Sequence, residues 1–183
     1  KADVVALANA GGDTINSIKA ANEFGITKTQ KLAGLLVFVN DVHSLGLNVT
    51  QGMQLTEAFY WDMNDETRAW SRKFFEKMKK MPNMLQAGAY SSTRHYLNGV
   101  KATGTDDTET VMKWMKANPI NDIFVKNGKI REDGRMMREM YLFEVKKPSE
   151  SKYPWDYYKL KATIPAEQAY RPLSVSSCPL VKK

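Results

Sequence analysis

Three polar or aromatic stretches of the sequence each follow an apolar run, and they carry the residue types best suited to holding a small molecule. They are residues 9–13 (Asn-Ala-Gly-Gly-Asp), residues 38–41 (Phe-Val-Asn-Asp) and residues 59–61 (Phe-Tyr-Trp). Side-chain amides, aromatic rings and loop N–H groups bind the polar and apolar parts of an organic solute without any chemical step. The residue types therefore indicate binding rather than catalysis.

Residues 9–13 also allow an alternative interpretation. Backbone N–H groups between a strand and a helix can hold a phosphate. The glycine fingerprints of nucleotide sites, G-x-G-x-x-G and G-x-x-x-x-G-K-[ST], are both absent here, and two glycines can equally serve a tight turn. A small α/β enzyme that binds a phosphate-bearing cofactor at residues 9–13 is therefore the alternative hypothesis.

Catalytic and metal-binding patterns are missing from the rest of the sequence. The single cysteine, Cys178, excludes an internal disulfide and a thiolate zinc cluster. The two histidines, His43 and His95, have no partner at the spacing of metal ligands, so we interpret both as surface or packing residues. We find no Ser-His-Asp arrangement and no nucleophile elbow. We predict no enzyme activity, no cofactor and no metal.

The composition is that of a globular protein with a mildly basic surface. Hydrophobic residues make up 43% and charged residues 26%, and the longest apolar run, residues 32–39, is too short to cross a membrane. Lys and Arg number 27 against 20 Asp and Glu, a net charge of +7, but the basic residues are scattered along the chain. A structural or nucleic-acid-binding protein that uses this charge is a third hypothesis, and the scatter of the basic residues disfavours it.

The first sixty residues predict the alternating pattern of a doubly wound α/β sheet. Residues 4–8, 32–39 and 53–60 are expected to be buried strands, with a helix after Asp13 as its N-cap and Gly25 as its C-terminal cap. Loops at the carboxyl ends of parallel strands share one edge, where open α/β sheets bind ligands. The candidate ligand-binding residues at that edge are Asn9, Ala10, Phe38, Asn40, Asp41, Tyr60 and Trp61.

Helices are expected to follow Trp61. One starts at Asp65, one spans residues 84–102 with an apolar stripe, and one starts after Asp106 or Asp107; the stripe consists of Leu85, Ala89, Tyr96 and Val100. Asn127-Gly128 predicts a tight hairpin and Asp133-Gly134 a further turn. Strands are expected at residues 141–145 and 157–164, and an irregular tail at residues 171–183.

Several stretches, in order along the chain, resemble the periplasmic substrate-binding proteins of branched-chain amino acid type ABC transporters. They are residues 2–25, residues 51–60, residues 81–104 with the pattern P…AY…L…A…G, and residues 128–145 with Gly128-Lys129-Ile130 and Asp133-Gly134. Each motif alone is weak, but the set covers nearly the whole chain.

The resemblance implies a type I two-lobed binding protein that closes on a small solute and docks to a permease in the inner membrane. Such proteins are about twice this length, so we expect this chain to be a C-terminal half whose missing lobe or self-association covers apolar helix surface. The implied parts are a second-lobe α/β core (1–80), helices that return towards the first lobe (81–120), and a hinge-crossing hairpin with late strands and tail (121–183). A periplasmic location is implied, with the signal peptide outside this sequence.

The resemblance also implies roles for individual residues. Asn9 and Ala10 match the first contact loop of the second lobe, and Asp41 replaces a carboxylate that grips the ammonium group of the solute. Tyr90 matches a tyrosine of the cleft. The aromatic residues Phe38, Tyr60 and Trp61 favour an apolar or aromatic carboxylate, with a branched-chain amino acid as the other class. No nucleic-acid partner is implied.

Overall fold

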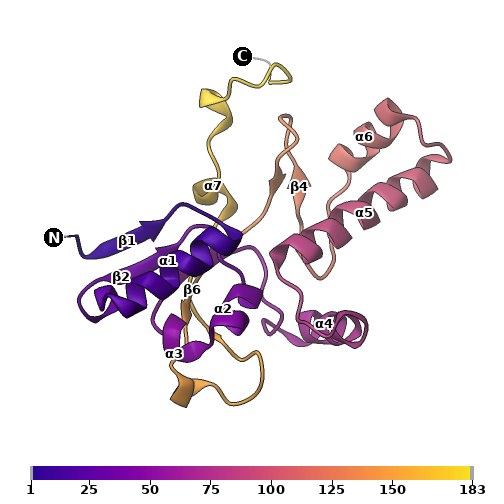
Figure 1. Cartoon of the computed structure of the whole chain (residues 1–183). Coiled ribbons are helices and arrows are strands. Elements are labelled where there is room, and N and C mark those ends of the chain that lie inside the picture. Colours follow the sequence, from indigo (N-terminus) through magenta and orange to yellow (C-terminus); the bar gives the residue numbers. More distant parts are fainter. Residues whose placement is uncertain (1, 182–183) are drawn as a thin grey trace. The chain divides into compact units, whose positions relative to one another are not determined.

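The structure is a computed structural model that describes residues 2–181 (Figure 1). It divides into two compact units. Unit 1 holds the residues up to Met84 together with Tyr141–Thr163, and unit 2 holds Leu85–Met140 together with the residues from Ile164 onward. The chain therefore passes between the units three times, after Met84, after Met140 and after Thr163.

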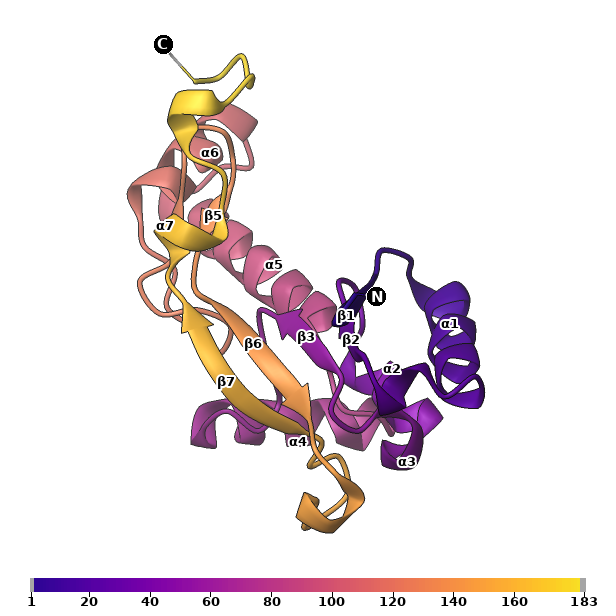
Figure 2. The same ribbon diagram turned by 90° about the vertical axis from the view of Figure 1, so that its left-hand side faces the viewer.

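Unit 1 is built on a five-stranded sheet. Its strands, in spatial order, are β1 (Val4–Leu7), β2 (Lys31–Gly34), β3 (Gln54–Glu57), β6 (Met140–Val145) and β7 (Tyr158–Ile164). The first three are parallel neighbours, and β6 is antiparallel to β3. Figure 2 shows β6 and β7 running in opposite directions. The predicted parallel α/β pattern is confirmed for β1 to β3.

The apolar run 32–39 is not one strand, as the sequence predicted, because the chain folds back at Gly34. A Cβ atom on Gly34 would lie 2.5 Å from Cγ2 of Val37, so the turn depends on this glycine. Val37 is buried by the turn, whereas Leu35 is 57% exposed. The expectation that residues 4–8 are buried is also wrong, because β1 is an edge strand on which Val4 is half exposed.

Three helices cover the parallel strands of unit 1. They are α1 (Gly11–Glu23), α2 (Val39–Leu45) and α3 (Leu47–Thr50), with a 3-10 turn at Ile26–Lys28. α1 contacts both α2 and α3, as expected when successive right-handed crossovers move in one direction across a sheet. α1 ends as the sequence predicted, because Gly25 follows it with a left-handed φ of 66°.

The fourth helix of unit 1, α4 (Asp65–Met78), begins one residue after its cap. Asn64 is the N-cap, and its side chain accepts a hydrogen bond of 2.9 Å from the backbone N–H of Thr67. The sequence predicted Asp65 for this role. Both residue types are good caps. Asn64 is favoured because its backbone N–H also donates a hydrogen bond of 3.0 Å to Thr67 Oγ1, which completes a capping box.

Unit 2 contains the helix pair α5 (Met84–Thr103) and α6 (Thr108–Ala117). The bounds of α5 agree with the prediction, and Asp107 caps α6 by accepting a hydrogen bond of 2.9 Å from Thr110 N. The apolar stripe of α5 is largely exposed in the structure: Leu85 and Tyr96 are 54% and 42% exposed. The residues that α5 buries are small or polar, namely Ala87, Ser91, His95 and Gly99.

Close approach of α6 explains this choice of face. A Cβ atom on Gly99 would lie 3.1 Å from Cγ1 of Val111 and 3.2 Å from Cε3 of Trp114. His95 binds the carbonyl oxygen of Met115 through Nε2 at 2.9 Å, so it is a packing residue. Small side chains let the two helices pack closely, and a larger apolar residue would not fit there.

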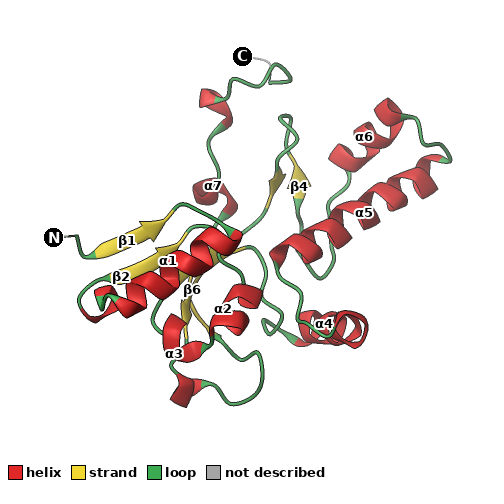
Figure 3. Cartoon of the chain, in the orientation of Figure 1, coloured by secondary structure: helices red, strands yellow, loops and turns green. Residues whose placement is uncertain are grey.

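The rest of unit 2 is mostly loop (Figure 3). A hairpin of β4 (Lys129–Ile130) and β5 (Met136–Met137) turns at Asp133-Gly134 as predicted. Asn127-Gly128 does not form the predicted tight hairpin, because Gly128 pairs with Ile120 across a longer loop. The remaining short elements of unit 2 are α7 (Ala166–Ala169) and a 3-10 turn at Leu173–Val175. A further 3-10 turn, at Pro148–Glu150, belongs to unit 1.

The predicted irregular tail is confirmed apart from the turn at Leu173–Val175, and residues 182–183 lie outside the described residues. Within residues 2–181, no helix has the length and apolar character that a membrane crossing requires.

The contact at Gly99 gives a testable prediction. We expect Gly99→Ala to lower the free energy of unfolding by about 1–3 kcal/mol, because the added methyl group forces α5 and α6 apart. Gly12→Ala is the matched control, since Gly12 is exposed in the first turn of α1 and has no atom within 4 Å of an added Cβ. Chemical denaturation measures both. Equal stability of G99A and the parent protein would contradict the packing argument.

Candidate ligand-binding edge

The carboxyl ends of β1, β2 and β3 lie next to one another in unit 1, because these strands are parallel neighbours. β1 ends at Leu7, β2 at Gly34 and β3 at Glu57. The three stretches picked out in the sequence all start here, and we call this the carboxyl edge. The structure therefore confirms that they are neighbours, while their contact with a ligand stays a prediction.

The first loop is fixed by the side chain of Asn9. Its Oδ1 atom accepts a hydrogen bond of 2.9 Å from Thr14 Oγ1, and its Nδ2 atom donates one of 3.0 Å to Ser17 Oγ. The N-cap of α1 is the exposed Ala10, not Asp13, and no side chain caps this helix. Asn9 thus positions the loop, and the first-turn N–H groups of α1 are left for another acceptor.

The second loop runs into α2. Asp41 Oδ2 accepts a hydrogen bond of 2.9 Å from Phe38 N, which makes Phe38 the N-cap position. Burial raises the pKa of Asp41, and the bond from Phe38 acts in the opposite direction. Asn40 donates to the carbonyl oxygen of Met81 (2.9 Å) and accepts from Nδ2 of Asn83 (2.8 Å), so its amide joins α2 to the segment before α5.

The third loop is held from a distant part of the sequence. The hydroxyl group of Tyr60 and the indole N–H of Trp61 both donate to the carbonyl oxygen of Trp155, at 2.7 and 2.9 Å. The Tyr60 oxygen also accepts a hydrogen bond of 3.0 Å from Tyr157 N. Tyr60 and Trp61 are only 5% and 6% exposed, so their rings belong to the core of unit 1 and have little free surface in this structure. Their role in binding stays a prediction.

Glu57 is a residue of this edge that the sequence analysis missed. It is 1% exposed, and its Oε1 atom accepts a hydrogen bond of 2.9 Å from the hydroxyl group of Tyr158, while Oε2 has no partner of normal geometry among the described residues. Burial raises its pKa to about 8, against the effect of Tyr158 and of the backbone N–H groups of Met84 and Val39. The sequence could have indicated that Glu57 is buried, because alternate residues of a strand share a face and Leu55 is a buried residue of the same strand.

Tyr90, the last predicted contact residue, lies on α5 in unit 2 and is 37% exposed. Its place in a cleft with the second loop stays a prediction. His43 stacks on Trp155 with a centroid distance of 3.8 Å, and its Nδ1 atom lies 2.7 Å from the Tyr157 hydroxyl group. Among residues 2–181, no three His, Cys, Asp or Glu side chains are grouped so that they could hold a metal ion.

An α/β unit whose parallel strands end in neighbouring loops belongs to the class of open α/β folds, which bind ligands at that edge. The family model described as periplasmic binding protein matches residues 1–152. The chain therefore belongs to the periplasmic binding protein family, and the resemblance seen in the sequence is confirmed.

Solved structures agree with this assignment. The chain is similar to a periplasmic binding protein from Burkholderia mallei (56% identity, TM-score 0.94), with 99% of this chain and 48% of that one covered. It is also similar to a branched chain amino acid ABC transporter periplasmic ligand-binding protein from Burkholderia xenovorans LB400 (43% identity, TM-score 0.89), with 99% and 49% covered.

A third similar structure shows the fold alone. It is a solute binding protein of an ABC transporter from Rhodopseudomonas palustris BisB5 in complex with 3,4-dihydroxy benzoic acid (17% identity, TM-score 0.76), with 90% and 45% covered. The chain spans about half the length of these proteins, and its fold is that of a type I periplasmic-binding-protein lobe. No curated protein matches the sequence.

Glu57 gives a prediction for stability as a function of pH. Unfolded, the carboxyl group ionises near its ordinary pKa of 4.5, whereas folded it keeps its proton up to about 8. Between these values the folded state binds more protons, so the free energy of unfolding falls as the pH rises and the loss is complete above about pH 8. This loss amounts to a few kcal/mol, about 1.4 kcal/mol for each unit by which the pKa is raised. We expect the free energy of unfolding of Glu57→Gln not to show this fall with pH.

Denaturant unfolding from about pH 5 to about pH 8.5 measures this slope. Glu76→Gln is the control, because Glu76 is exposed on α4 and should leave the slope unchanged. Parallel stability curves for E57Q and the parent protein would show that Glu57 does not titrate as described.

Proposed function

We propose that the protein is the solute-binding component of an ABC importer. It captures a small organic solute between two lobes in the periplasm and delivers it to a permease in the inner membrane. Membership of the periplasmic binding protein family supports this, as does the name of the relative from Burkholderia xenovorans. The protein acts by binding and release, without catalysis. Family membership likewise disfavours the alternative of an enzyme with a phosphate-bearing cofactor at residues 9–13.

The observation that carries the proposal is the carboxyl edge of unit 1, where three neighbouring loops bring amide, aromatic and acidic groups together. In this proposal residues 1–80 form the α/β core of the second lobe. Residues 81–120 are helices that return towards the first lobe, and residues 121–183 contain the hinge-crossing hairpin, the late strands and the tail. The solute contacts are Asn9, Ala10, Phe38, Asn40, Asp41, Tyr60, Trp61 and Tyr90.

Charge at the carboxyl edge favours an amino acid with an apolar side chain, such as a branched-chain amino acid, over a plain aromatic carboxylate. None of the eight contact residues is basic. Burial disfavours the charge of Asp41, and an ammonium group beside it would offset that cost. The half-buried ring of Phe38, three positions earlier, suits the apolar side chain. The carboxylate of the solute would then bind the N–H groups at the start of α1 or the other lobe.

Asp41 provides the first test. We expect Asp41→Asn to weaken binding of leucine by roughly 10- to 100-fold, because it removes a charged hydrogen-bond acceptor while it keeps an oxygen for Phe38 N. Calorimetry on the full-length protein measures the effect. Asp3→Asn, at an exposed position, is the matched control. Tight binding of benzoate without binding of leucine would instead assign the aromatic carboxylate class, and binding of neither would count against both solutes.

The half-length of the chain provides a second test. We expect the 183-residue chain alone to bind the solute about 100-fold more weakly than the full-length protein, because the other lobe supplies part of the contact free energy. Exposed apolar residues on α5, such as Leu85 and Leu97, should also cause self-association or retention of the other lobe. Calorimetry and sedimentation measure these effects. Tight binding by a monomeric 183-residue chain would contradict the two-lobe proposal.

A further inference from the structure

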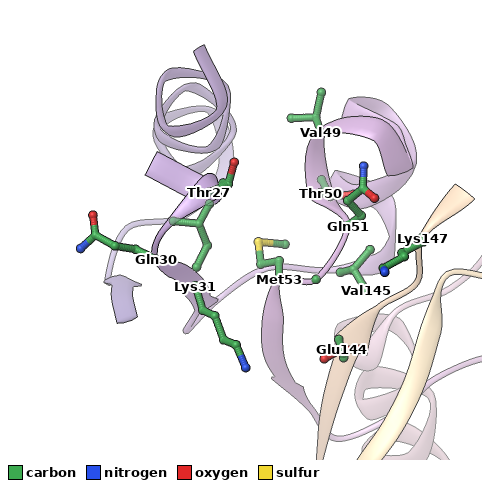
Figure 4. A pocket seen from close by; sticks show the side chains of 12 residues that line it. Thr27, Gln30, Lys31, Val49, Thr50, Gln51, Met53, Glu144, Val145 and Lys147 are labelled. Atoms are coloured by element: carbon green, nitrogen blue, oxygen red, sulfur yellow. The ribbon is translucent and has the colours of Figure 1, made fainter. Parts of the chain in front are cut away.

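A hollow lies in unit 1 at the opposite end of the strands from the carboxyl edge (Figure 4). Its volume is about 230 Å³, and it opens between the start of β2, the end of α3 and the end of β6. Its floor consists of the buried side chains Leu32, Met53 and Val145. Thr27, Gln30 and Gln51 contribute to a polar rim.

Two lysines flank this apolar floor. In Figure 4, Met53 lies between Lys31, at the start of β2, and Lys147, which follows β6. Because β2, β3 and β6 are adjacent, these lysines stand about two strand spacings apart, roughly 10 Å along the sheet. Within residues 2–181, neither ammonium group has a hydrogen bond or an ion pair closer than 4 Å, although the charge of Lys147 helps to lower the pKa of Glu150.

The acidic residue of the hollow does not neutralise them. Burial opposes ionisation of Glu144, but the hydrogen bond from Gln54 and the charges of Lys161 and Lys159 hold its pKa below the ordinary value. Gln54 Nε2 lies 2.9 Å from Glu144 Oε2, and Lys159 Nζ lies 3.5 Å from Oε1. The charge of Glu144 is therefore balanced by the lysines of β7. Glu150, the acidic residue whose charge interacts with Lys147, also forms an ion pair with Lys159, so Lys31 and Lys147 keep positive charge for a ligand.

We propose that this hollow is a second binding site, which takes a small organic anion with an apolar body. Lys31 and Lys147 bind the anionic group, and the apolar body lies on Met53 and Val145. The hollow is smaller than the pockets that hold drug-sized ligands, so a ligand of the size of a short carboxylic acid fits it. The site is at the amino end of β2, whereas the solute site of the proposed function is at the carboxyl ends, so the two proposals stand independently.

The methyl groups of two methionines can report on the two sites separately. Met53 lines the hollow, and Met84 Sδ accepts a hydrogen bond of 3.3 Å from Ala58 N at the carboxyl edge. The experiment is a titration of the full-length protein, labelled with ¹³C at the methionine methyl groups, with sodium hexanoate. We expect the Met53 resonance, assigned from Met53→Leu, to shift in a saturable way while the Met84 resonance stays in place.

Two comparisons test the chemistry. We expect the double substitution K31Q/K147Q to raise the Kd of hexanoate at least tenfold, as the loss of charge-assisted hydrogen bonds implies. The matched control K73Q/K77Q, at exposed lysines of α4, should change it less than twofold. Hexanamide, which lacks the charge, should bind at least tenfold more weakly than hexanoate.

Three results would overturn the proposal. They are an unshifted Met53 resonance, equal affinity for hexanoate and hexanamide, and unchanged affinity of K31Q/K147Q. A shift of Met84 alone would mean that hexanoate binds at the carboxyl edge, which supports a carboxylate as the solute and rejects the second site. Failure of leucine to bind at the carboxyl edge would leave the Met53 result unaffected.

Discussion

One buried carboxyl group, that of Glu57, connects elements from the whole length of unit 1. It lies at the end of β3, accepts a hydrogen bond from Tyr158 on β7, and faces the first backbone N–H groups of α2 and α5 at Val39 and Met84. The first N–H groups of a helix have no partner within the helix, and a buried carboxyl group is destabilising without donors. The carboxyl group of Glu57 and the first N–H groups of α2 and α5 satisfy one another only if the starts of both helices and β7 lie at the end of β3. That meeting point is the carboxyl edge.

The aromatic part of the same edge depends on the loop between β6 and β7. Trp155 takes a left-handed φ of 71°, and its carbonyl oxygen receives the hydrogen bonds of Tyr60 and Trp61. An ion pair between Lys146 and Asp156 closes this loop beside Trp155. The loop thereby holds the third ligand loop in one conformation. A preformed edge reduces the conformational entropy that binding of a solute would otherwise cost.

Parallel strands give the sheet two chemically different ends. Each crossover helix returns the chain to the same end of the sheet, so residues that precede strands gather at one end and residues that follow strands gather at the other. In unit 1 the carboxyl ends have Asp41 and the protonated carboxyl group of Glu57. The opposite end has Lys31, which starts β2, and Lys147, which follows the antiparallel β6. The two ends therefore differ in the charged groups that they carry.

The sequence by itself determined the features that local chemistry controls: the three parallel strands, the left-handed cap at Gly25, the bounds of α5 and the cap at Asp107. It also predicted which loops share the carboxyl edge, since that follows from parallel order alone. Only the tertiary structure decided which groups meet there. Tyr60 is bound 95 positions away at Trp155, and Glu57 meets Tyr158 at a separation of 101. Likewise α5 buries small residues and exposes its apolar stripe because α6 packs so closely against Gly99. Such contacts join residues far apart in the chain, so no local pattern specifies them.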